Sequence, residues 1–460
     1  MKTDLKYAMS WIIRLGYLTI IYSTIFGISL WCYSAQAQEP IPQKVVNAST
    51  PNPVGSGARA MGMGGAFIAV ADDATAASWN PAGLTQLKRP ELSFALSYFH
   101  RRDDFDSEFH PETSGVEKSW SRDLNYLSAA YPFKFLDRNM IVSLNYQLLY
   151  EFNRSISTNI NSKSLYPPVR FNQKVDFDQE GDLKTLSPAF AIEITPNFSI
   201  GITFNIWTDN LFWSNGWESD TNIKGKTYQF GVLTSKVDSK DHDRYYEFSG
   251  YNGNFGFLWN INQHLTVGGV FKAPFTADVK HERVQIDKVR VPGFPEIKKK
   301  WRTDEDIDID MPMSYGLGVA WRFTDAFSMS LDVYRTEWDH FRLEDGKGNH
   351  LNPITGKPHH ESRTDETNQV RLGGEYLFIF PKTVIPLRAG IFYDPEPSRK
   401  SPEDFWGATI GSGVSLGPLI FDCAYQFRFG KDVAGDVFNI PSTTADVTQH
   451  LVVISFIYHF

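Results

Sequence analysis

The stretch that decides the fold is Met140–Asn153, MIVSLNYQLLYEFN. Side chains of a β-strand alternate between its two faces, so alternating apolar and polar residues predict a strand with one apolar face. The opposite face of this stretch is mostly polar, with Ile141 and Leu149 as exceptions. Its predicted apolar face comprises Met140, Val142, Leu144, Tyr146, Leu148, Tyr150 and Phe152.

The same alternation recurs along the chain and predicts fourteen strands. They are 91–99, 122–133, 139–153, 183–195, 198–212, 245–261, 264–284, 304–323, 327–344, 366–378, 385–396, 405–417, 419–432 and 446–460. Six connections are predicted to be long polar loops, namely 100–121, 154–182, 213–244, 285–303, 345–365 and 433–445. Most of the others are short turns. An even number of strands, with long loops at one end and short turns at the other, is typical of an outer-membrane β-barrel. A soluble β-sandwich would not place charged residues on its inner faces.

The N-terminus has the features of a secretory signal. A basic region precedes the apolar segment Leu15–Trp31, and the small-x-small sequence Ala35-Gln36-Ala37 predicts cleavage, so that Gln38 begins the mature chain. A retained membrane anchor is the alternative interpretation. We therefore expect residues 1–37 to be a signal peptide, 38–90 a leader and plug, and 91–460 the barrel.

Charge and motifs exclude several classes of function. Loss of three basic residues and Asp4 with the signal changes the formal net charge from −8 to −10, which argues against a nucleic-acid partner. Cleavage leaves Cys423 as the only cysteine, so we expect no intramolecular disulfide. The sequence lacks the nucleophile-elbow, phosphate-loop and zinc-protease motifs, and we predict no enzymatic activity and no cofactor. The pair His359-His360 is too small a set to predict a metal site.

The segment Gly55–Leu84, GSGARAMGMGGAFIAVADDATAASWNPAGL, breaks the pattern of strands. Its six glycines allow tight turns and close packing, which predicts a compact, irregular plug with short helical pieces. Asn80, Pro81, Ala82 and Gly83 predict a turn at its end, because asparagine can cap its own backbone and proline fixes its φ angle.

Four stretches resemble the FadL/TodX family of outer-membrane transport proteins. The plug matches the family's N-terminal hatch at Ala58–Ala66 and at Asn80–Leu84, and Met311–Trp338 and Arg371–Pro397 resemble two of its hairpins. The resemblance implies a fourteen-stranded barrel, closed by a hatch, that moves hydrophobic molecules passively across the outer membrane. Long-chain fatty acids and aromatic hydrocarbons are substrates of the better-known branches. It also implies a route from an external groove, past the hatch, to a lateral exit at a kinked third strand. Met140–Asn153 contains no glycine or proline that would predict such a kink.

Several charged residues are candidates for substrate contact. Arg371, Arg388 and Arg428 alternate with apolar residues and should point into the barrel, toward acidic residues there. One interpretation is a structural network with those acids, and the other is bidentate binding of a substrate carboxylate by an arginine. Lys272 is a further candidate. The expected acidic partners are Asp332, Glu375, Asp394 and Asp422.

Other candidates lie in the hatch and the loops. Arg59, Asp72 and Asp73 are expected to pair with the barrel wall or to take part in gating. The loops carry apolar residues, among them Phe212, Trp213 and Trp217, which could form a docking groove or simply pack over the barrel mouth.

The C-terminal strand alternates apolar residues and ends in Phe460. It resembles the signal read by the barrel-assembly machinery, so we expect that machinery, outer-membrane lipid and lipopolysaccharide as partners of a monomer. The alternatives to transport are an accessory role in protein secretion or surface assembly, an outer-membrane lipase or protease, and a surface receptor without a ligand.

Overall fold

The computed structural model describes residues 50–52, 55–108, 110–165, 168–361, 364–398, 402–434 and 443–460. The predicted signal peptide and most of the leader lie outside the described residues. No helix in the described part of the chain is long and apolar enough to cross a membrane.

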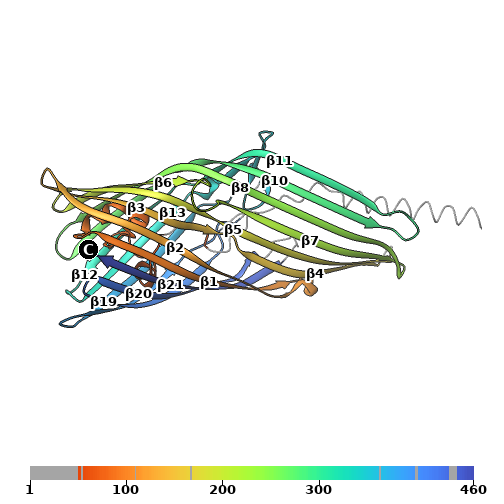
Figure 1. Ribbon diagram of the computed structural model, residues 1–460. Helices are drawn as coiled ribbons and strands as arrows, with labels where there is room; N and C mark the ends of the chain where they lie inside the picture. The colour runs from red at the N-terminus through yellow and green to blue at the C-terminus, as the bar shows by residue number, and fades with distance from the viewer. Residues whose placement is uncertain are drawn as a thin grey trace, which may run out of the picture.

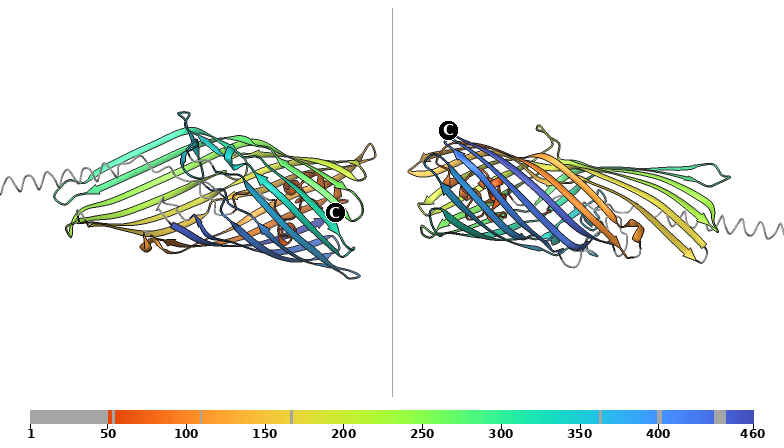
Figure 2. Two further views of the ribbon diagram at one scale, coloured as in Figure 1. Left: turned by 180° about the vertical axis from the view of Figure 1, so that it is seen from behind. Right: turned by 90° about the horizontal axis from the view of Figure 1, so that it is seen from below.

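Fourteen antiparallel strands close into a barrel, as the sequence predicts (Figures 1 and 2). Each strand pairs with the next one around the barrel, and β1 closes the circle by pairing with β21. The strands of the barrel are β1 (Glu91–Ser107), β2 (Gly115–Phe135), β3 (Arg138–Glu151), β5 (Pro168–Thr195), β6 (Phe198–Trp207), β8 (Val232–Asn260), β9 (Leu265–Lys272), β12 (Ser314–Arg322), β13 (Phe327–Thr336), β17 (Thr367–Ile379), β18 (Val384–Tyr393), β19 (Phe405–Leu416), β20 (Leu419–Ala434) and β21 (Thr443–His459).

The outer face of the barrel is apolar and its inner face is largely polar. On β12, for example, Tyr315, Leu317, Val319 and Trp321 are exposed, whereas the intervening Gly316 and Gly318 are buried. This arrangement suits a wall whose outside contacts lipid, because apolar side chains cost little there and charged ones are disfavoured.

The third strand contains a bulge that the sequence pattern does not reveal. Leu148 pairs with Lys184 and Tyr150 pairs with Leu183, so Leu149 has no partner across the β3–β5 ladder. A bulge of one residue reverses the facing of every residue beyond it. The prediction that Tyr150 and Phe152 share the outer face of Met140 is therefore wrong, and both side chains are buried inside.

The same sheet continues beyond the outer rim of the barrel as an extension. β5 and β8 run through both parts, and between and beside them lie β4 (Arg154–Leu165), β7 (Gly216–Gln229), β10 (Phe275–Arg290) and β11 (Ile297–Met311). In Figure 1 these strands project to the right, at the end opposite the C-terminus. Short pieces complete its edge, namely β14 (Arg342–Glu344), β15 (His350–Asn352) and β16 (Lys357–Pro358).

The prediction of long loops is wrong for four of the six segments. Residues 100–121, 154–182, 213–244 and 285–303 consist mostly of paired strands. Charged residues occur on both faces here, for example Asp243 inward and Arg244 outward on β8, so these strands lack the apolar face by which barrel strands are recognised. Of 433–445, residues 435–442 lie outside the described part.

At several positions a strand of the barrel and a strand of the extension meet end to end, with a break between them. Three segments predicted as single strands are interrupted: 264–284 at Ala273-Pro274, 304–323 at Pro312-Met313, and 327–344 at the short helix η3 (Trp338–His340). Proline cannot donate a hydrogen bond to a ladder, which accounts for the first two breaks. β3 and β4 are separated at Phe152-Asn153, and β6 and β7 at residues 208–215.

His281 joins three strands of the extension and gives it a predicted dependence on pH. Its ring nitrogens lie 2.7 Å from Asp243 Oδ1 and 3.1 Å from Glu305 Oε1. Burial lowers the pKa of His281, but hydrogen bonds and charge from Asp243 and Glu305 outweigh burial, so the pKa lies above its usual 6.5. A raised folded-state pKa stabilises the fold fully below the unfolded-state value, and this stabilisation is lost as pH rises through the folded-state value.

We therefore expect amide exchange in residues 277–289 to accelerate as pH rises above about 6.5, beyond the intrinsic effect of pH. Hydrogen exchange measured across this range checks the prediction. In His281→Gln the additional pH dependence should disappear, and an unchanged profile in that variant would contradict this role for His281.

The hatch lies inside the barrel at the end that carries the short turns (Figures 1 and 2). It contains α2 (Ala58–Gly62), α3 (Ala76–Trp79) and the 3₁₀ helix η1 (Pro81–Gln86). Phe67 packs edge-to-face on Trp79 at its centre, with 5.9 Å between ring centroids. The wall approaches the hatch closely at glycines: a Cβ on Gly373 would lie 2.0 Å from the carbonyl oxygen of Met63, and one on Gly256 would lie 2.0 Å from Asn80 Oδ1. The inner surface of the barrel is therefore closely packed against the hatch.

Candidate functional site

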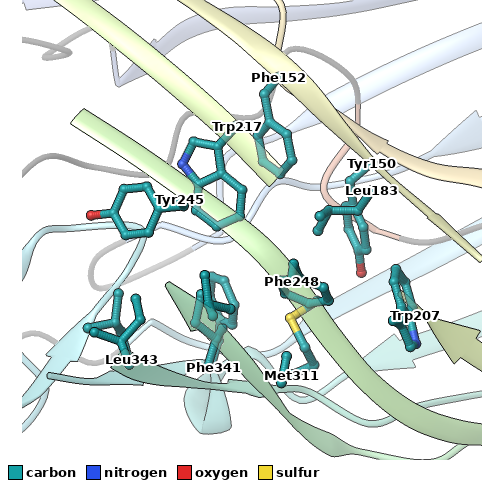
Figure 3. Close-up of a cluster of buried hydrophobic side chains, with 14 of the residues drawn as sticks. Tyr150, Phe152, Leu183, Trp207, Trp217, Tyr245, Phe248, Met311, Phe341 and Leu343 are labelled. Atoms are coloured by element: carbon teal, nitrogen blue, oxygen red, sulfur yellow. The ribbon is translucent and has the colours of Figure 1, made fainter. Parts of the chain in front are cut away.

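A cluster of buried apolar side chains forms where the barrel meets the extension (Figure 3). We call it the junction cluster. It comprises Tyr150, Phe152, Leu183, Trp207, Trp217, Tyr245, Phe248, Ala277, Val279, Ile307, Ile309, Met311, Trp338, Phe341 and Leu343. These residues come from both the barrel and the extension, so the cluster depends on the way these two parts of the sheet meet.

The breaks between strands supply much of the junction cluster. Phe152 follows the end of β3, Trp207 ends β6, and Met311 ends β11 just before Pro312. A break or bulge re-aims a side chain that would otherwise point to lipid. Only Trp217 of this cluster is a binding residue predicted from sequence; the remaining members were not singled out. Pro274 and Pro312 are the signal that could have located two of the breaks, which lie next to Phe275 and Met311.

The aromatic rings of the cluster stack on one another. Trp217 lies with its ring centroid 4.7 Å from that of Tyr245 and 4.8 Å from that of Phe152. Trp207 packs against Phe248 at 5.7 Å, and its Nε1 donates a hydrogen bond to Asn252 Oδ1 at 3.0 Å. The cluster presents large apolar and aromatic faces shielded from water, which favour an apolar ligand.

The predicted inward arginines lie on β17, β18 and β20, and each contacts acidic residues of the wall. Arg388 bonds Glu375 and Asp422, both at 2.5 Å. Arg428 lies 2.7 Å from Glu396 and stacks on Phe405. All three arginines are almost fully buried, and their charges are balanced locally.

Arg371 also holds the hatch. Its Nη1 donates to the carbonyl oxygen of Gly64 at 3.0 Å, and its Nη2 lies 3.3 Å from Asp394. Of the acids expected as partners, Asp332 has a different role, because its Oδ2 accepts hydrogen bonds from the backbone amides of Phe67 and Ile68 at 2.6 and 2.8 Å. The arrangement of these groups favours the structural network over carboxylate binding by an arginine.

Replacing Arg388 by methionine should destabilise the barrel strongly, because it leaves the buried Asp422 without its cation. Loss of one partner from a buried pair costs about 3–5 kcal/mol in the free energy of unfolding. Urea unfolding in lipid vesicles measures this cost. Arg302→Met is the matched control, because Arg302 pairs with Glu282 and Asp304 on the exposed surface and should lose less than about 1 kcal/mol. Equal losses of unfolding free energy in the two variants would contradict the role of Arg388 as the partner of a buried carboxylate.

The predicted hatch residues form two connections to the wall. Arg59 pairs with Asp72 within the hatch and with Glu375 of β17 at 3.0 Å. Asn80 Nδ2 donates to the carbonyl oxygens of Ile68 and Phe257, both at 2.9 Å, and so links hatch and β8. Asp73 instead accepts from the amide of Thr75 inside the hatch.

The turn after Asn80 is tightly packed. The Asn80 Oδ1 accepts from the amide of Ala82 at 3.2 Å, and Pro81 begins η1. A Cβ on Gly83 would lie 2.1 Å from the carbonyl oxygen of Ala71, so only glycine fits without a shift of the backbone.

The remaining predicted residues lie apart from one another. Phe212 is 99% exposed, and Trp213 packs edge-to-face on Tyr146, an outward residue of β3, at 5.0 Å. Both belong to the excursion 208–215 on the outside of the wall, so the structure does not bring them to Trp217. Lys272 ends β9 and is buried, three residues before Phe275, which packs on the junction cluster.

A closed fourteen-stranded barrel with an apolar exterior, an internal hatch and an apolar cluster above it defines a hatch-bearing transport protein of the outer membrane. Residues 46–405 match the family described as outer membrane protein transport protein (OMPP1/FadL/TodX). The chain belongs to this family, which places it in the bacterial outer membrane.

Solved structures show the same fold. A FadL homologue from Pseudomonas aeruginosa superimposes with a TM-score of 0.59 at 14% identity, over 90% of this chain and 100% of that one. The toluene transporter TodX from Pseudomonas putida gives a TM-score of 0.55 at 14% identity, over 91% and 100% of the two chains. The monoaromatic hydrocarbon channel CymD gives 0.51 at 15% identity, over 89% and 98%. No curated protein matches the sequence.

Proposed function

We propose that the protein is a passive uptake channel for hydrophobic molecules and that these molecules bind at the junction cluster on their way to the hatch. The observation that carries the proposal is the buried aromatic cluster where the barrel meets the extension. Apolar solutes gain free energy by leaving water for such a surface, whereas a water-filled pore would offer them no gain.

The substrate class depends on the cation beside the cluster. The buried Lys272 ends β9 three residues before Phe275, which packs on the cluster, and is the candidate that we propose for meeting the carboxylate of a long-chain fatty acid. An aromatic hydrocarbon would need only the rings. The proteins of known structure with this fold include hydrocarbon channels as well as a FadL homologue, so both classes are tested below.

A titration on the purified protein separates these outcomes. It compares an alkyl carboxylate with an uncharged alkane or arene of similar size. For a fatty-acid channel we expect saturable binding of the carboxylate that weakens about tenfold in Lys272→Gln, while binding of the uncharged ligand is unchanged. Equal binding of the two ligands would assign the protein to hydrocarbons. No saturable binding of either would overturn the proposal and favour an accessory or receptor role.

We further propose a lateral exit through β2, β3 and β5. On the inside of this wall, Ala130, Ile141 and Ala189 pack on the hatch. On the outside lies a groove of about 430 Å³, lined among others by Ala129, Leu144 and Pro188. Small side chains make the wall thin here, and the β5–β6 ladder has no pairs at Ser187 and Pro188.

The periplasmic mouth supports the same route by its chemistry. The space beneath the hatch, about 740 Å³, is lined largely by polar residues, among them Asn197, Asn260, Asn262, Gln263, His264 and Arg322. An apolar molecule would gain nothing by entering this space, whereas the lateral groove leads to lipid.

Filling the outer groove tests the exit. Ala129 faces the groove, and Ala129→Trp should slow transport into proteoliposomes severalfold without weakening ligand binding. Ala408 faces outward on β19 and provides the control, since Ala408→Trp should leave transport unchanged. Unchanged transport in Ala129→Trp would overturn the lateral exit but not the proposed binding at the cluster.

A further inference from the structure

A cationic patch lies on the lipid-facing surface of β1, β2 and β21, near the outer end of the barrel. Arg122 is exposed there, and its guanidinium lies 5.4 Å from the ring centroid of Trp120 and 5.7 Å from that of Tyr98. Tyr98 is the cross-strand partner of Arg122, and Arg102 pairs across the strands with Lys118. The cations therefore lie on the same face of one ladder, with the outward pair His100–Trp120 between them.

Along the strands, the cationic patch lies at the level of the outer membrane–water interface. From Trp120 toward the periplasmic turn, the outward residues of β2 are chiefly apolar, with Leu124, Leu127 and Tyr131 exposed. Beyond Trp120 the next outward residue is the cation Lys118. Aromatic residues mark the edges of the apolar band of a membrane barrel, so Arg122 lies just inside the outer edge of this band.

A charge at this level needs compensation, and two other outward cations of the barrel have acidic partners. Arg335 lies 2.8 Å from Glu337 and 2.9 Å from Glu366, and Lys184 lies 2.6 Å from Asp182. By contrast, within the part of the chain that the structure describes, no carboxylate is paired with Arg122 or with Lys118. The neighbouring Arg102 is balanced by Asp104 at 3.0 Å.

An apolar groove adjoins Arg122. It has a volume of about 630 Å³ and opens toward lipid. Its walls come from the three strands, and Arg122 and Asp123 are its charged members. The lining residues are Leu96, Ser97, Tyr98, Arg122, Asp123, Leu124, Val452 and Ile454.

We propose that this groove and the unpaired cations bind a phosphorylated lipid of the outer leaflet. An acyl chain occupies the groove between Leu96, Leu124 and Ile454, and a headgroup phosphate contacts Arg122 and Lys118. Arginine and phosphate form strong charge-assisted hydrogen bonds, and the stacked aromatic rings hold the guanidinium in place. The phosphate provides an anion for these cations. The apolar groove beside them accommodates an acyl chain and therefore selects a lipid over free phosphate.

Lipid binding to the purified barrel tests the proposal by native mass spectrometry. The probe is bis-phosphorylated lipid A, compared with its dephosphorylated form. We expect Arg122→Gln/Lys118→Gln to weaken binding of the phosphorylated lipid at least tenfold. Arg335→Gln, which alters a cation balanced by acids, should leave binding unchanged, and Arg122→Lys should restore part of the affinity.

Three results would overturn the proposal: equal binding by the double variant and the natural protein, equal binding of the dephosphorylated lipid, or full displacement by millimolar inorganic phosphate. The last result would show that the patch recognises phosphate alone. Both altered side chains are exposed, so the double variant should fold, and an unchanged midpoint of thermal unfolding verifies this.

Discussion

Replacing Asp332 by alanine is expected to loosen the hatch in the barrel. The carboxylate of Asp332 is fully buried and accepts the backbone amides of Phe67 and Ile68. Hydrogen bonds to a charged group contribute about 1.5–3 kcal/mol each, and the two amides would remain buried without this acceptor. Together the loss is roughly 3–6 kcal/mol in the free energy of hatch docking. Hydrogen exchange in residues 60–71 should accelerate by at least a hundredfold.

Single-channel recording measures the ion conductance of the same variant and provides an independent test. A loosened hatch should admit ions, so Asp332→Ala should show conductance events that are rare in the natural protein. Asp332→Asn keeps an acceptor oxygen of the same shape and should be intermediate. The control is Asp310→Ala, because Asp310 pairs with Arg342 in the extension, away from the hatch. Normal exchange protection of the hatch in Asp332→Ala would show that this contact does not hold it.

Replacing Trp217 by alanine is expected to abolish most ligand binding at the junction cluster. Trp217 is stacked between Tyr245 and Phe152, and removal of its ring deletes the largest aromatic surface at that point. Truncation of a central aromatic contact typically costs about 2 kcal/mol or more, which is roughly thirtyfold in Kd. Titration with the ligand that binds the natural protein best measures the loss.

The control for this variant comes from the same stretch of sequence. Phe212 is an aromatic residue five positions earlier, but it lies on the outside of the wall and is exposed. Phe212→Ala should therefore bind ligand as the natural protein does. If both variants lost affinity equally, an external docking groove at 208–215 would replace the junction cluster as the binding site.

The barrel could be predicted from the sequence because lipid imposes a simple pattern on its strands. Where one face of a strand contacts lipid, alternation is strong, as on β12, and the count of fourteen is confirmed. The extension is not constrained in this way. Residues such as Asp243 and Arg244 place charges on both faces of β8, and most of the extension was therefore predicted as loops.

The candidate site was only partly predictable from the sequence, because small local irregularities of the strands determine which side chains face the interior. The bulge at Leu149 reverses the facing of Tyr150, and no residue type in Met140–Asn153 signals it. Trp213 and Trp217 are close in sequence, yet the break between β6 and β7 leaves one outside the wall and the other inside. Such breaks depend on pairing between strands distant in sequence, which periodicity alone does not report.

The most direct test of the proposed function is transport of an apolar compound into proteoliposomes that contain the natural protein or Trp217→Ala. The proposal predicts a saturable flux without any energy source, reduced at least tenfold in Trp217→Ala and unaffected in Phe212→Ala. A flux that equals that of protein-free vesicles, or one that Trp217→Ala leaves unchanged, would contradict passage of apolar molecules through the junction cluster.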